Sequence, residues 1–228
     1  MGSSNARIKR QHRAKWRRWI RDLEDPIQDL VISRKLYEDL GEIVKANAAA
    51  RVPADFHVWL AKNYAVSIAV GVRRLLDEDA DSLSVARLLT DIRAHNKSIT
   101  RRSHRHWMRR APVEVSDAHF DELAGSGSAF LPKHEPAADL SRLKKAGAAT
   151  IDMVNKRIAH MDIDGRTRRR RLPRFKDTYA AIDEIEAVYL KYRALLTGKS
   201  SDSLLPVWVY DWTSIFEHPW KLTGGTGE

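Results

Sequence analysis

The residues best suited to chemistry lie at the end of a predicted helix. There, His160 follows the cations Lys156 and Arg157 and the amide side chain of Asn155. An imidazole titrates near neutral pH and can transfer a proton, and a nearby ammonium or guanidinium can stabilise negative charge that develops during a reaction. These four residues form the candidate catalytic set. A structural alternative stays open, in which His160 only caps the C-terminal end of its helix, where a cation is favoured.

Arginine-rich segments supply a second kind of candidate site. The chain has a formal net charge of +10 and a pI of about 9.9, and a surplus of this size attracts polyanions such as nucleic acid. A solvated basic surface is the simpler interpretation, because charge alone specifies no partner. The predicted nucleic-acid-binding residues are Arg166, Arg168, Arg169, Arg170, Arg171 and Arg174 in one loop, and Arg101 and Arg102 in an earlier cluster.

The composition argues against several other kinds of site. Cysteine is absent, which excludes a disulfide framework, a thiolate metal site and a cysteine nucleophile. His104 and His106 lie two residues apart, a spacing that puts them on different faces of a helix, and arginines surround them. We therefore predict no metal and no cofactor. No apolar run approaches the roughly 18 residues of a membrane span, so we expect no membrane partner and a cytoplasmic location.

The elements that must position these residues are helices. Apolar residues recur at three- and four-residue spacing over about 27–44, 56–75, 83–92, 140–158 and 175–195, and no strand pattern stands out. Asp25 and Pro26 predict a helix start, because Asp can cap a helix and Pro fits its first turn. The helix predicted over 54–76 is apolar on more than one side, and we expect it to be the most buried. The fold class is therefore all-α, a bundle of about five to seven helices.

Three segments lie outside this regular pattern. Residues 5–21 predict a basic helix that either rests on the bundle through its tryptophans or contacts nucleic acid. Residues 111–136 contain prolines and glycines and predict an irregular crossover with one short helix near 116–123. The aromatic C-terminal stretch 204–222 is predicted to pack on the bundle as an extended strap with a short helix.

The helix predicted to begin at Pro136 has two contact faces. Its apolar stripe runs from Leu140 through Gly147 and Val154 at helical spacing. His160 falls about opposite this stripe when successive residues are placed about 100° apart. The face that leads to His160 carries small residues, so it can pack on another helix of the chain or on a partner subunit.

Several segments resemble a known superfamily. Residues 155–162, the pair of stretches 72–77 and 84–92, and the stretch 211–220 are similar to HEPN domains (higher eukaryotes and prokaryotes nucleotide-binding), above all to their abortive-infection, or phage-defence, branch. Together with the composition, the resemblance predicts a basic N-terminal helix at 1–24, a single HEPN-like helical domain at 25–222 and a disordered tail at 223–228.

The resemblance implies a helical bundle that usually dimerises. In catalytic members, an Arg and a His a few residues later build a metal-independent ribonuclease site at the dimer interface. In this chain His160 matches the His, but the positions where the Arg would stand hold Met153, Val154 and Asn155. Lys156 or Arg157 would then have to supply the positive charge.

Two functions follow from the resemblance and the residues present. The first is a metal-independent endoribonuclease, or toxin, in phage defence, in which His160 moves the proton, Lys156 or Arg157 holds the phosphate and Asn155 orients it. The alternative is a non-catalytic HEPN-like dimer that binds nucleic acid or a protein and lacks the catalytic Arg. A purely structural or regulatory homodimer is a third interpretation. The implied partners are a second copy of the chain, RNA and a cognate antitoxin.

Overall fold

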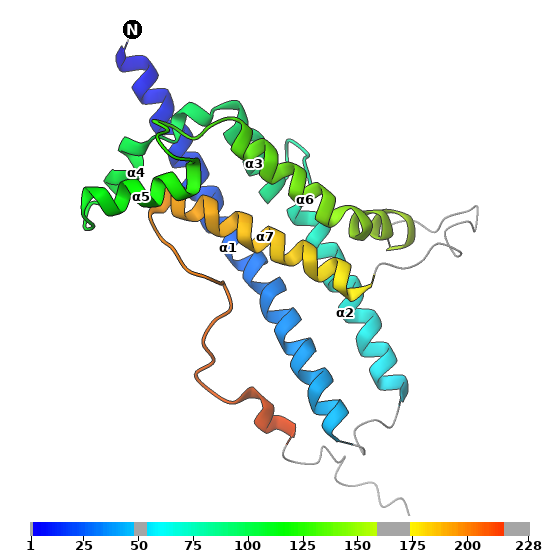
Figure 1. Cartoon of the computed structure of the whole chain (residues 1–228). Helices are drawn as coiled ribbons and strands as arrows, with labels where there is room; N and C mark the ends of the chain where they lie inside the picture. Colours follow the sequence, from blue (N-terminus) through cyan, green and yellow to red (C-terminus); the bar gives the residue numbers. More distant parts are fainter. Residues whose placement is uncertain (1, 48–53, 159–173, 217–228) are drawn as a thin grey trace, which may run out of the picture.

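The periodic apolar pattern folds into helices that pack around a shared core (Figure 1). The computed structural model describes residues 2–47, 54–158 and 174–216. The α-helices within these ranges are α1 (Gly2–Ala46), α2 (Ala54–Leu75), α3 (Val85–Ala94), α4 (Arg101–Trp107), α5 (Val113–Ala124), α6 (His134–Met153) and α7 (Phe175–Thr197). The only strand-like pairing of the described residues is one antiparallel bridge between Thr100 and Phe130. The predicted all-α class is confirmed.

Helix α1 is one continuous helix of 45 residues that runs through Pro26. The predicted helix start at Asp25 and Pro26 is therefore wrong. Proline removes one helical hydrogen bond, but the apolar residues on both sides of it pack into the same core. Ile20, Leu23 and Ile27 are all fully buried, so tertiary packing holds the helix together across the proline.

Helix α7 contributes many buried residues to the core of the bundle. It packs against α1, α2 and α6, and Tyr189 and Tyr192 in its second half are fully buried. The Tyr192 hydroxyl donates a 2.8 Å hydrogen bond to the buried carboxylate of Asp139 on α6. Gly198 ends α7 in the left-handed conformation, with φ of 71°, which glycine adopts without a side-chain clash.

The prediction that α2 is the most buried helix is wrong for its first half. Phe56 and Trp59 are 51% and 59% exposed, whereas Ile68 and Val72 further along are fully buried. Figure 1 shows that the start of α2 and the end of α1 extend together away from the other helices. The apolar residues of α2 are therefore part of the core only in the second half of the helix.

The structure gives the bounds of the helix in the irregular crossover and the exposure of the residues in the C-terminal strap. The short helix of the crossover is α5, which begins three residues before the predicted start at 116. The segment after α7 extends away from it and ends in the short 3-10 helix η5 (Trp212–Phe216) (Figure 1). Leu204 is buried, but Val209 and Tyr210 are 92% and 67% exposed. The prediction that this segment packs on the bundle through its aromatic residues thus fails for Tyr210.

Candidate functional site

The candidate catalytic stretch begins where α6 changes its helical form. At Val154 the α-helix gives way to the π-helical turn η3 (Val154–Ile158). Such turns are rare and are frequently found at functional sites. Val154, which occupies one of the positions where the resemblance would place an Arg, is 4% exposed and faces the core. The next residue, Asn155, is exposed.

A guanidinium from another helix reaches this stretch. Nε of Arg73, in the last turn of α2, donates a 2.8 Å hydrogen bond to Oδ1 of Asn155. The described part of the chain offers the two terminal nitrogens of Arg73 no hydrogen bond. A guanidinium held through Nε can still present those two nitrogens to a phosphate. The sequence could not reveal this pair, because 82 positions separate its members.

The other predicted catalytic residues differ in how the structure places them. Lys156 forms an ion pair with Asp152, one helical turn before it, which reduces the net positive charge at this point. Arg157 contributes its backbone to the π-helical turn. His160 lies outside the described residues.

Three of the predicted nucleic-acid-binding residues lie in the described ranges, and they belong to two different parts of the chain. Arg166, Arg168, Arg169, Arg170 and Arg171 lie outside the described residues. Arg174 is exposed and precedes α7, where its backbone N–H donates to the Asp177 carboxylate. Arg101 and Arg102 belong to α4, and Arg102 is exposed. Figure 1 shows α4 on the side of the bundle opposite to the end of α6.

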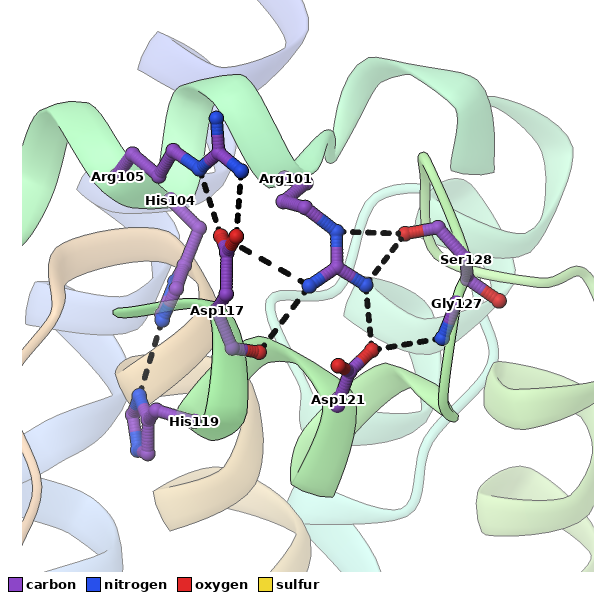
Figure 2. Close-up of polar contacts among 8 residues, drawn as sticks. All are labelled: Arg101, His104, Arg105, Asp117, His119, Asp121, Gly127 and Ser128. Atoms are coloured by element: carbon purple, nitrogen blue, oxygen red, sulfur yellow. Dashed lines mark hydrogen bonds and ion pairs between the residues drawn. The ribbon is translucent and has the colours of Figure 1, made fainter. Parts of the chain in front are cut away.

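Arg101 lies in a network that joins α4 to α5 and the following loop (Figure 2). Its guanidinium forms ion pairs with Asp117 and Asp121 and donates hydrogen bonds to the backbone oxygen of Ser128. Arg105 pairs with the same Asp117. These contacts give Arg101 a structural role, and its binding to nucleic acid stays a prediction.

Beside this network lies a chain of hydrogen bonds that the sequence analysis missed. Nε2 of the fully buried His104 lies 2.9 Å from Nδ1 of His119 on α5 (Figure 2). The other nitrogen of His104 lies 3.3 Å from the backbone oxygen of Leu195, and Nε2 of His119 lies 3.1 Å from the Ser200 hydroxyl. Because a carbonyl only accepts, His104 carries its proton on Nδ1 and accepts from His119. Burial is the largest cause that lowers the pKa of His104.

A groove runs between the middle of α1 and the second half of α2. Its floor includes the apolar side chains of Leu30 and Val70, and its rim includes Asp22, Asp25 and the single cation Arg74. This acidic rim makes the groove a poor place for a polyanion. Arg74 therefore lies beside carboxylates of α1, whereas its neighbour Arg73 contacts Asn155.

The comparison with protein families supports the resemblance drawn from the sequence. The HEPN AbiU2 family model matches residues 13–206, which include α2, α6 and the π-helical turn. The chain belongs to the HEPN AbiU2 family. No curated protein and no solved structure gives a match.

Membership of the HEPN AbiU2 family places the chain in the abortive-infection branch of the HEPN superfamily, as the sequence predicted. None of the helices in the described ranges is long and apolar enough to cross a membrane. The same ranges contain no group of three or more His, Asp or Glu side chains that could hold a metal ion. The polar groups that the structure brings together at the candidate site are Arg73 and Asn155.

Proposed function

We propose that this HEPN AbiU2 chain is a metal-independent endoribonuclease that acts as a toxin in phage defence. The observation that carries the proposal is the hydrogen bond from Arg73 to Asn155. It puts a guanidinium beside the one stretch of the chain where a family Arg is missing. The missing charge is thus supplied from α2 and not from within the stretch itself.

The proposed reaction uses the substrate as its own nucleophile. The 2′-hydroxyl of RNA attacks the adjacent phosphorus while its proton passes to His160, which acts as the general base. The bond from phosphorus to the 5′-oxygen breaks, and this oxygen leaves with a proton from solvent. His160 then returns its proton to solvent. Arg73 and Lys156 stabilise the charge on the phosphate, Asn155 orients Arg73, and Arg157 contributes to the same positive field.

A second candidate function is a HEPN AbiU2 dimer that binds RNA or a cognate antitoxin without cutting RNA. Two observations favour it. The stretch has Met153, Val154 and Asn155 where the family Arg would stand. The Lys156 charge is partly neutralised by Asp152. The same fold would then present Arg73 and Asn155 to a ligand without catalysis.

A homodimer belongs to both candidates, and the exposed start of α2 supports it. Phe56, Val58 and Trp59 are each about half exposed. Exposed groups of large apolar side chains commonly mark protein interfaces. Light scattering should give the mass of a dimer, and the substitution Trp59→Ser should lower the fraction of dimer. A monomer at every concentration would rule the dimer out.

Cleavage assays distinguish the two functions. Labelled RNA is incubated in EDTA with wild-type protein, His160→Ala, Arg73→Ala and the control Arg74→Ala, and the products are examined for 2′,3′-cyclic phosphate ends. Loss of a catalytic base or of a charge-stabilising donor commonly costs about 100-fold or more in rate. We expect that loss in the first two variants and wild-type cleavage in Arg74→Ala.

Each other outcome has a definite meaning. If Arg73→Ala cleaves as fast as the wild type, Arg73 has no part in the reaction. If no variant matters, including His160→Ala, the activity comes from elsewhere. If wild-type protein binds RNA in a salt-dependent way but leaves it intact, the non-catalytic function is the correct one.

A further inference from the structure

The two basic segments of the first half of the chain meet in the folded protein. The guanidinium carbon of Arg17 on α1 lies 4.1 Å from the centre of the Trp107 ring on α4. One turn earlier on α1, Arg13 donates a 2.8 Å hydrogen bond to the backbone oxygen of Ser98, just before α4. Residues 7–21 and 101–110, which the sequence presents as separate clusters, therefore form one surface, which we call the α1–α4 surface.

Most cations of the α1–α4 surface form no ion pair with a described carboxylate. The exceptions are Lys15, which pairs with Asp91, and Arg101 and Arg105, which pair with carboxylates of α5. Neither segment contains Asp or Glu, and no described carboxylate forms an ion pair with Arg10, Arg13 or Arg17. Burial, and after it the neighbouring arginines, lower the pKa of both Arg13 and Arg17. Partly buried charges in proteins are usually paired. These guanidiniums are therefore suited to an anionic partner.

The spacing of the arginines on α1 matches an extended partner. Arg10, Arg13, Arg17 and Arg21 follow one another at intervals of three and four residues, which places them along one face of the helix. At 1.5 Å per residue this row is about 16 Å long. A duplex carries regularly spaced phosphates along such a length, which in B-form DNA spans about five base pairs at 3.4 Å each.

The burial of the tryptophans argues against two other polyanionic partners. Trp16 is fully buried and Trp19 packs against the core, so this part of α1 has no free apolar face for insertion into a membrane. The Trp107 ring is covered by Arg17 and is not free to stack on an unpaired base, which is the usual contact with single strands.

We propose that the α1–α4 surface binds the sugar–phosphate backbone of a nucleic-acid duplex. The identification of this duplex as the stem of a folded RNA rests on the proposed function. Figure 1 shows this surface at the opposite side of the bundle from the end of α6, so it is a docking surface separate from the candidate catalytic site. Arg10 and Arg17 supply contacts from α1. Arg102, exposed on α4, supplies one from the second segment.

The test compares two triple variants in the full chain that also carries His160→Ala, so that cleavage does not interfere. One replaces Arg10, Arg17 and Arg102 with Gln. The control replaces Lys35, Lys62 and Lys145, cations on other surfaces, with Gln. Binding of a labelled RNA hairpin is measured by fluorescence anisotropy between 50 and 300 mM salt. Single-stranded RNA, a DNA duplex and anionic vesicles are measured beside it, and circular dichroism confirms that both variants fold.

The expected result follows from counterion release. Loss of three phosphate contacts makes the plot of log affinity against log salt shallower by about 2.7, and the Kd at 0.1 M salt rises on the order of 100-fold. The control should change Kd by less than about threefold, since long-range charge alone is screened at this salt. The DNA duplex should show the same dependence on the three arginines, because the backbone is what the surface contacts.

Three outcomes would overturn the proposal. They are equal losses in the two triple variants, tighter binding to single-stranded RNA than to the hairpin, and vesicle binding that depends on the same three arginines. Absence of RNA cleavage by protein with an intact His160 would refute the proposed reaction and leave the docking surface unaffected. The two inferences can therefore fail independently.

Discussion

The buried ring of His104 should make the protein less stable as the pH falls. Its pKa is lowered mainly by burial, and His119 and Arg101 lower it further. The hydrogen bond to the backbone of Leu195 raises it but does not offset the burial. In the unfolded chain the same ring titrates near pH 6.5. Unfolded protein therefore binds more protons below that pH. The stabilising contribution is complete above about pH 6.5 and is lost as the pH falls toward the folded pKa.

The geometry explains why the folded protein resists this proton. Burial leaves a charged His104 ring without water, and a proton on its Nε2 would face Nδ1 of His119 at 2.9 Å, so this contact would have to reverse its direction or break. One proton taken up on unfolding changes the free energy of unfolding by at most about 1.4 kcal/mol per pH unit. For a protein of this size that corresponds to a fall in Tm of about 3–5 °C per pH unit.

Thermal unfolding followed by circular dichroism at pH 7.5, 6.5 and 5.5 measures this slope. His104→Gln should show a smaller fall in Tm across the range than the wild type, even though it starts from a lower Tm because it loses the ring contacts. His106→Gln, which alters an exposed histidine two residues away, should parallel the wild type. The reasoning is refuted if His104→Gln keeps the wild-type slope, or if the wild type gains stability as the pH falls.

Two further predictions concern single polar groups in the core and at a helix start. Asp139→Ala should lower the free energy of unfolding in urea by about 3 kcal/mol, because the fully buried Asp139 carboxylate pairs with Lys191 and accepts from Tyr192. The control Asp183→Ala, which removes an exposed carboxylate paired with Arg34, should cost less than about 1 kcal/mol. Similar losses in the two variants would contradict this account. Ser84→Ala should cost about 1–2 kcal/mol in the same measurement, because the Ser84 hydroxyl accepts a hydrogen bond from the backbone N–H of Arg87 at the start of α3. An unchanged midpoint of urea unfolding would show that this helix cap is dispensable.

Local signals in the sequence were sufficient where neighbouring residues decide the structure. The helical periodicity that predicted α6 and α7 depends on residues within a few positions of one another. The Asp25–Pro26 pair was misleading because a local start signal competes with apolar residues on both sides of it. Core packing of those residues kept α1 continuous.

Contacts between distant positions could not be predicted. Nothing near Arg73 in the sequence indicates that it meets Asn155, and nothing near His104 indicates His119 as its partner. Such pairs arise from the way α2 packs on α6 and α4 on α5. The aromatic residues of the last segment similarly indicated apolar character. They could not predict that Tyr210 is exposed, because its burial depends on where the segment lies on the bundle.

Helix α1 is buried in the bundle along one part of its length, whereas its C-terminal part extends away from the other helices together with the start of α2. From Trp16 to Val31 α1 is anchored in the core, but none of the described residues between 32 and 67 is fully buried. The stacked rings of Tyr37 and Tyr64, 3.8 Å apart, hold the two helices together there. Amide hydrogens in this half should exchange with solvent through local opening, well before global unfolding exposes those near Ile20. The projecting end would then melt and re-form while the bundle stays folded, so that a partner could capture it at little cost to the rest of the protein.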